Sequence, residues 1–100
     1  MIDLSRIEGF DWDDGNIRKS IEKHSVSLME AEQVFLDPQL LVLSDEKHSF
    51  EETRFHALGT TAAGRRLQIS FTLRHDQSRI RVISARDMNR KERAIYDKET

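Results

Sequence analysis

The chain has 100 residues, of which 37% are hydrophobic and 34% are charged, and it contains no cysteine. This length predicts a single domain with one modest core, and the absence of thiols excludes a disulfide, a thiolate zinc site and a thiol nucleophile. No apolar run approaches the roughly 18–20 residues of a membrane span, and the acidic N-terminus is unlike a signal peptide. We therefore expect a cytoplasmic protein that makes no membrane contact.

Charge is divided unevenly along the chain. Residues 1–53 carry five Lys and Arg against thirteen Asp and Glu, a charge of −8, whereas residues 65–93 carry nine against three, a charge of +6. Clustered arginine suits phosphate recognition, because guanidinium stays charged and offers paired donors. The same cluster is also compatible with a solvated, ion-paired surface, and charge alone does not separate the two interpretations.

The first elements are predicted from periodicity. Residues 7–13 alternate weakly and indicate a short strand, and Asp13 or Asp14 then caps a first helix. Ile17 and His24 lie on the apolar stripe of that helix.

A second helix begins at a capping box. Ser27 and Glu30 have the spacing in which each side chain bonds the other residue's backbone amide. The helix ends at Asp37, because the residue before Pro38 avoids the α region.

Strands dominate the rest of the chain, and their predicted ranges are 40–44, 52–58, 66–74 and 80–85. Asn89 and Glu92 form a second capping box, which opens a C-terminal helix. The expected fold class is α+β: an antiparallel sheet of four to five strands packed with two N-terminal helices and one C-terminal helix, with the helices on one face.

Strict alternation divides the arginines of the last strand. Arg79 and Arg81 share one face, whereas Ser84 and Arg86 share the other. All four line one site only if a bulge intervenes or if the strand ends before Arg86. We expect the strand to end first, because Asp87 and Asn89 are typical of turns and caps.

Three blocks of residues resemble the BrnT family of ribonuclease toxins. They are Phe10-Asp11-Trp12-Asp13 with Lys23-His24-Ser25-Val26-Ser27; Ala31 with Val34-Phe35-Leu36-Asp37-Pro38; and residues 51–59 with 81–86 and 92–96. The resemblance implies a RelE-like fold and cleavage of cellular RNA without a metal ion or other cofactor. It also implies neutralisation by a BrnA-like antitoxin with a ribbon-helix-helix fold, and contact with promoter DNA only through the antitoxin complex.

Some positions depart from the family pattern. Asn16, Ser20, Ser25 and Leu28 stand where Lys, Asn, Gly and Phe are usual. Glycine at position 25 would end the first helix in a left-handed conformation, which costs another residue about 1 kcal/mol. These departures motivate an alternative: a weak or inactive toxin-like module that only pairs with its antitoxin. Direct DNA binding is a weaker hypothesis, because no helix-turn-helix pattern is present.

The candidate catalytic residues combine the resemblance with side-chain chemistry, and they are Lys23, His24, Glu52, Arg54, Arg81 and Arg86. The arginines suit the charge that builds on a phosphate during RNA cleavage. Glu52 is expected to hold Arg54 rather than to act as a base, because a neighbouring arginine lowers a carboxyl pKa.

Histidine is the natural acid or base near neutrality. His24 is the first candidate, although its place on an apolar stripe is equally typical of a packed residue. His56, which alternation exposes, is an alternative to His24. Glu92 is expected only to cap its helix, and Tyr96 to pack the helix against the sheet.

Overall fold

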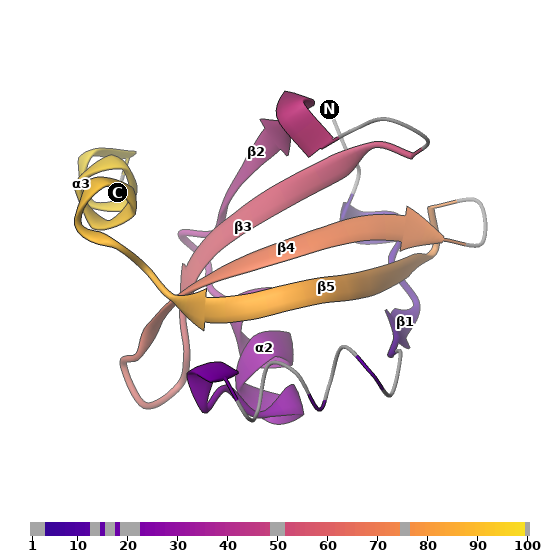
Figure 1. Ribbon diagram of the computed structural model, residues 1–100, viewed down its shortest axis with the longest axis horizontal. Helices are drawn as coiled ribbons and strands as arrows, with labels where there is room; N and C mark the ends of the chain where they lie inside the picture. Colours follow the sequence, from indigo (N-terminus) through magenta and orange to yellow (C-terminus); the bar gives the residue numbers. More distant parts are fainter. Residues whose placement is uncertain are drawn as a thin grey trace.

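The computed structural model describes residues 4–12, 15, 18, 23–48, 52–74 and 77–99 (Figure 1). Its elements, in chain order, are η1 (Leu4–Arg6), β1 (Gly9–Asp11), α2 (Leu28–Val34), β2 (Leu41–Asp45), η2 (Glu46–His48), β3 (Arg54–Thr60), β4 (Arg66–Arg74), β5 (Arg79–Asp87) and α3 (Arg90–Glu99). The capping boxes predicted at the starts of α2 and α3 are both present.

Two α-helices are described in full, where the sequence predicts three. The predicted first helix, with its cap at Asp13 or Asp14, falls largely outside the described residues. Within it, Gly15, Arg18, Lys23 and His24 are described, and all four are helical. The next residue, Ser25, has a φ of 53°, the left-handed conformation in which a glycine would ordinarily end a helix.

The sheet is mixed rather than antiparallel. Its strand order is β1-β5-β4-β3-β2, and the pairs from β2 to β5 are antiparallel as expected. β1 instead runs parallel to β5, with Phe10 opposite Ile80. The prediction was wrong on this point because alternation identifies a strand but not its direction, and no hairpin joins these two strands.

A bulge in β5 changes which side chains of this strand lie on each face of the sheet. Ser70 pairs with Ser84 but Phe71 pairs with Val82, so Ile83 is one extra residue. Because alternation is reset there, Arg81 and Arg86 lie on the same face of β5. The apolar face carries Phe55, Ala57, Leu67, Ile69, Phe71, Ile80, Val82 and Ala85, and the polar face carries Arg54, His56, Gln68, Ser70, Thr72, Arg81, Ser84 and Arg86.

α2 lies against the apolar face and closes the main core (Figure 1). The ring of Phe35, just after α2, meets Phe71 edge-on with centroids 5.1 Å apart, and Phe71 is fully buried. Close packing also explains Gly59, since a Cβ there would lie 2.8 Å from a methyl of Val34. Trp12 also packs against this core, and its indole donates to Glu32.

α3 packs beyond one end of the polar face, so the prediction that all helices share one face was wrong. It forms a second small core in which Leu58, Met88 and Tyr96 are buried. The Tyr96 hydroxyl donates to Asp37, and it accepts a hydrogen bond of 3.0 Å from the hydroxyl of Thr60. Tyr96 is therefore a packing residue, as expected, and it ties α3 to the segment that follows α2.

Candidate functional site

Three predicted arginines lie on the polar face. Arg54 of β3 and Arg81 of β5 stand in one row of the sheet, each directly opposite Thr72 of the strand between them. Arg86 lies further along β5, opposite Gln68. The prediction that β5 ends before Arg86 was wrong, because the strand continues to Asp87 and the bulge at Ile83 brings Arg86 to this face.

Arg86 is held by Glu92 in a bidentate ion pair. Its two terminal nitrogens donate to the two carboxylate oxygens at 2.7 and 2.9 Å. Hydrogen bonding to Glu92 raises the pKa of Arg86, whereas burial alone would lower it. Burial would raise the pKa of Glu92, but hydrogen bonds from Arg86 and the Asn89 amide bring it below its usual value.

The role of Glu92 was only partly predicted. Its carboxylate caps α3 as expected, accepting from the backbone amide of Asn89 at 2.9 Å, and it also fixes the guanidinium of Arg86. The sequence signal was available: a capping glutamate six residues after an arginine at a strand end. That signal is informative only once β5 is known to lead directly into α3.

His56 stands at the centre of a hydrogen-bonded group on the polar face. Its Nε2 lies 3.0 Å from a carboxylate oxygen of Asp45 on β2. Its Nδ1 lies 3.1 Å from the hydroxyl of Ser70 and also contacts the amide nitrogen of Gln68, both on β4. The His56 side chain is 30% exposed, so a ligand on this face can reach it.

Glu52 lies just before β3, and its carboxylate forms an ion pair of 3.4 Å with Arg74 at the far end of β4. The expected role for Glu52 was to hold Arg54, and that role stays a prediction. The described ion pair with Arg74 follows from the register, since Arg54 lies opposite Thr72 and Glu52 therefore lies beside Arg74.

Lys23 and His24 lie at the end of the N-terminal helical residues, where Arg65 binds the chain. The guanidinium of Arg65 donates to the backbone carbonyls of His24 at 3.0 Å and Ser25 at 2.8 Å. It also pairs with Asp87, and hydrogen bonding to that carboxylate raises the pKa of Arg65. Alternation along β5 places Asp87 on the opposite face from Arg86.

These contacts associate His24 with the Asp87 side of the sheet. The charge of His24 contributes, after the hydrogen bonds from Arg65, to a lowered pKa for Asp87. The structure thus gathers Arg54, Arg81 and Arg86 with His56 on the polar face, and it describes no contact between His24 and that group.

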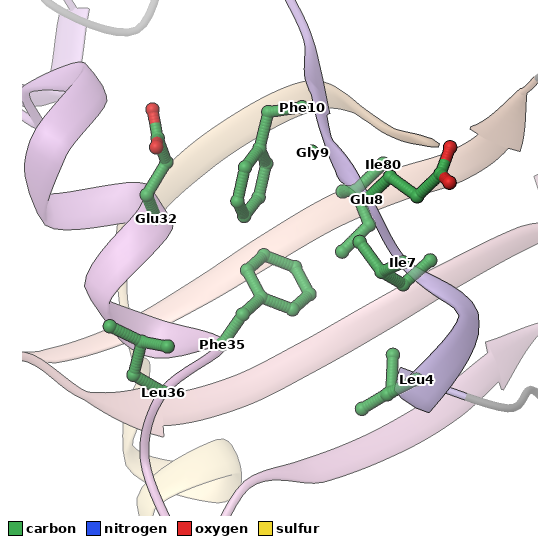
Figure 2. Close-up of a pocket in the computed structure, with 9 residues that line it drawn as sticks. All are labelled: Leu4, Ile7, Glu8, Gly9, Phe10, Glu32, Phe35, Leu36 and Ile80. Carbon is green, nitrogen blue, oxygen red and sulfur yellow. The ribbon is translucent and has the colours of Figure 1, made fainter. Parts of the chain in front are cut away.

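A separate apolar pocket of about 360 Å³ lies between β1 and α2. Figure 2 shows the rings of Phe10 and Phe35 near one another in it, with the carboxylates of Glu8 and Glu32 on opposite sides. Neighbouring Leu36 is 81% exposed. The lining residues carry no cation, so this pocket is unsuited to phosphate.

In the described part of the chain, no three His, Asp or Glu side chains gather in a group able to hold a metal ion. Among the same residues, no helix is long and apolar enough to cross a membrane.

The fold and the polar face define a class: a small α+β protein that presents arginines and a histidine on one sheet face. Residues 12–92 match the family described as ribonuclease toxin, BrnT, of type II toxin-antitoxin system. Because the match covers most of the chain, the protein belongs to the BrnT family, and membership implies an antitoxin as a partner.

The fold is also similar to a solved structure. The 1.1 Å crystal structure of the Brucella abortus ribonuclease toxin BrnT aligns with a TM-score of 0.63 and 18% sequence identity, over 82% of this chain and 97% of that chain. At this identity the likeness concerns the fold alone. No curated protein matches the sequence.

Proposed function

We propose that the chain is an endoribonuclease that cleaves cellular RNA without a metal ion, and so inhibits translation and growth. The observation that carries the proposal is the gathering of Arg54, Arg81 and Arg86 on the polar face. Guanidinium groups bind phosphate oxygens through paired donors and remain charged at every physiological pH. Family membership supports the choice of RNA as the substrate.

Each arginine has a defined part in this proposal. Arg54 and Arg81, in one row across β3, β4 and β5, bind the phosphate to be cleaved and stabilise the charge that builds on it. Arg86 binds an adjacent phosphate. Its bidentate pairing with Glu92 holds the guanidinium in place before RNA arrives, which lowers the entropic cost of binding.

The proposal includes the partner. A BrnA-like antitoxin of the ribbon-helix-helix type neutralises the toxin by laying an acidic segment over the polar face, and promoter DNA is contacted only through that complex. The basic charge of residues 65–93 supports this, because complementary charge directs association. An antitoxin that docks beside α2 and leaves Arg81 open to RNA would contradict this docking.

Arginine substitutions test the activity. Arg81→Gln and Arg54→Gln should each slow cleavage of single-stranded RNA about 10–100-fold, since each removes a charge-assisted contact of about 1.5–3 kcal/mol. Arg6→Gln, which changes an exposed arginine of η1, is the matched control and should cleave normally. Wild-type cleavage should persist in excess chelator.

The same assay separates the binding-only alternative. Induction of the wild-type chain should arrest growth and degrade bulk RNA, and Arg81→Gln should relieve both effects. Soluble, folded wild-type protein that binds its antitoxin but leaves RNA and growth unchanged would favour the inactive module instead.

A further inference from the structure

The ring of His56 contacts three polar side chains, although it is partly exposed to solvent. Both ring nitrogens are engaged: Nε2 with Asp45 across the β2–β3 pair, and Nδ1 with Ser70 and Gln68 across the β3–β4 pair. The three partners come from two strands that flank β3 on either side. Such an arrangement fixes the plane of the imidazole and the position of each nitrogen.

The partners also determine which nitrogen carries the proton. An ionised Asp45 only accepts hydrogen bonds, so Nε2 bears the hydrogen that faces it. Nδ1 of the neutral ring is then a lone pair, to which the amide of Gln68 and the hydroxyl of Ser70 donate. The ring is thereby held as a base whose lone pair is directed at Gln68 and Ser70 on the polar face.

Charged groups of four elements bear on this ring. Asp45 of β2 contacts it, and Glu92 of α3 interacts with it electrostatically. Arg54 precedes it by two residues on the same face of β3, and Arg86 of β5 is paired with Glu92. β4 contributes only the uncharged Gln68 and Ser70 beside the ring. The carboxylate of Asp45 touches the ring directly, so an imidazolium formed by proton uptake has a counter-charge in place.

We propose that His56 is the proton-transfer residue of the ribonuclease, with Asp45 as its positioning residue. This inference rests on the proposed function. The bound RNA places a 2′-hydroxyl at Nδ1, where it replaces the donor supplied by Gln68. His56 is the polar-face residue whose side-chain type titrates near neutrality, and it stands in the row next to Arg54.

The reaction is balanced without a co-reactant. Nδ1 takes the proton of the 2′-hydroxyl as the 2′-oxygen forms a bond to phosphorus, while Arg54 and Arg81 stabilise the phosphate charge. The bond from phosphorus to the 5′-oxygen then breaks, and the imidazolium returns its proton to that oxygen. The products are a 2′,3′-cyclic phosphate and a free 5′-hydroxyl.

The central experiment measures cleavage of a fluorescent single-stranded RNA by the full chain between pH 5 and 9. His56→Gln should lower the rate at least 100-fold, in line with general acid–base catalysis. Its affinity for the all-2′-deoxy form of the same oligonucleotide should stay within about two-fold, because the arginines are unchanged.

Two further variants separate chemistry from structure. Adding imidazole to His56→Ala should restore part of the lost rate, which no purely structural role predicts and which requires only that this variant folds. Asp45→Asn should lower kcat while KM stays within about two-fold, because the amide no longer fixes the ring proton on Nε2 as the carboxylate does. An unchanged kcat in Asp45→Asn would remove Asp45 from the mechanism.

The outcomes are distinguishable from failure of the proposed function. A folded wild-type chain that cleaves no RNA overturns the proposed function and this inference together. Wild-type cleavage that persists unchanged in His56→Gln overturns the inference alone. Loss of activity in His24→Gln with full activity in His56→Gln overturns it in favour of His24.

Discussion

The two faces of the sheet are built from the same three central strands but obey different rules. On the apolar face, Phe71 and Ile69 are fully buried and contact other apolar groups beneath α2. On the polar face, the equally buried Gln68 and Thr72 each have hydrogen-bond partners. Burial is therefore similar on the two faces, and what differs is how each buried group is compensated.

This difference explains where chemistry is possible. Apolar packing stabilises the fold without regard to orientation, because burial is non-directional. The polar face instead holds directional bonds, such as the two between Arg86 and Glu92, and these fix the orientation of the guanidinium. Packing on the apolar face stabilises the sheet, and the stable sheet keeps the polar side chains in fixed positions.

The bulge at Ile83 sets the face on which each later residue of β5 lies, so a one-residue shift after it should have the largest effect. Insertion of one alanine between Ser84 and Ala85 moves Arg86 by one position, which turns it toward the apolar face and Ala85 away from it. An unpaired buried arginine costs about 3–5 kcal/mol, so the variant should show no cooperative urea transition. Deletion of Ile83 is the control, because Val82 stays opposite Phe71 and Ser84 opposite Ser70, and it should keep a cooperative transition; equal losses in the two variants would contradict this account.

Phe71 tests the apolar face alone. Phe71→Ala removes a fully buried ring that meets both Phe35 and Phe55, and it should lower the free energy of unfolding by about 3–5 kcal/mol. Ser84→Ala, on the polar face of the neighbouring strand, is the control and should change it by less than about 0.5 kcal/mol. Urea denaturation with an unchanged m-value measures both.

Tyr96 tests the link between α3 and the segment after α2. Tyr96→Phe removes the hydroxyl bound to Asp37 and should cost about 1.5–3 kcal/mol at pH 7. Burial would raise the pKa of Asp37, but the bonds from Tyr96 and from two backbone amides bring it below its usual value.

Because the pKa of Asp37 is lowered, the loss of stability in Tyr96→Phe should depend on pH, and the sign of that dependence is known. The stabilisation is fully present above the usual pKa of 3.8 for Asp37, and it is lost as pH falls through the lower folded-state pKa. The difference in free energy of unfolding between wild type and Tyr96→Phe should therefore become smaller below pH 3.8. The corresponding difference for Phe71→Ala should not change with pH, because that substitution removes no contact with a titrating group. Parallel pH profiles for the two variants would refute the assignment to Asp37.

The smallest effect concerns Ser25, beside the helical end that Arg65 binds. Ser25→Gly should raise the free energy of unfolding by about 0.5–1 kcal/mol, because glycine adopts the observed φ of 53° without strain. Ser27→Gly is the control: at a φ of −78° glycine relieves nothing, and the capping hydroxyl is lost. Thermal denaturation should show opposite shifts for the two variants.

Local patterns in the sequence predicted local structure well. Alternation from Leu67 to Leu73 assigned β4 to its two faces correctly, and the Ser27–Glu30 and Asn89–Glu92 boxes marked two helix starts. In each case the cause lies within a few residues of the effect. Charge and resemblance also selected Arg54, Arg81 and Arg86 as site candidates, and the three lie on one face of the sheet, while their role stays a prediction.

What the sequence did not predict depends on partners far along the chain. The extra residue at Ile83 is defined only by pairing with β4, and the direction of β1 only by its position beside β5. The contacts of His56 with Asp45 and Gln68 likewise need three strands in register. Alternation within one strand contains none of this information.

The parallel pairing of β1 with β5 has a consequence for the growing polypeptide. Phe10 of β1 pairs with Ile80, which lies 70 residues later in the sequence, and Arg81 and Arg86 follow Ile80. Contacts between such distant segments form late, because a long loop must first close. A nascent chain therefore cannot assemble the row of Arg54 and Arg81 on the polar face until β5 has been synthesised.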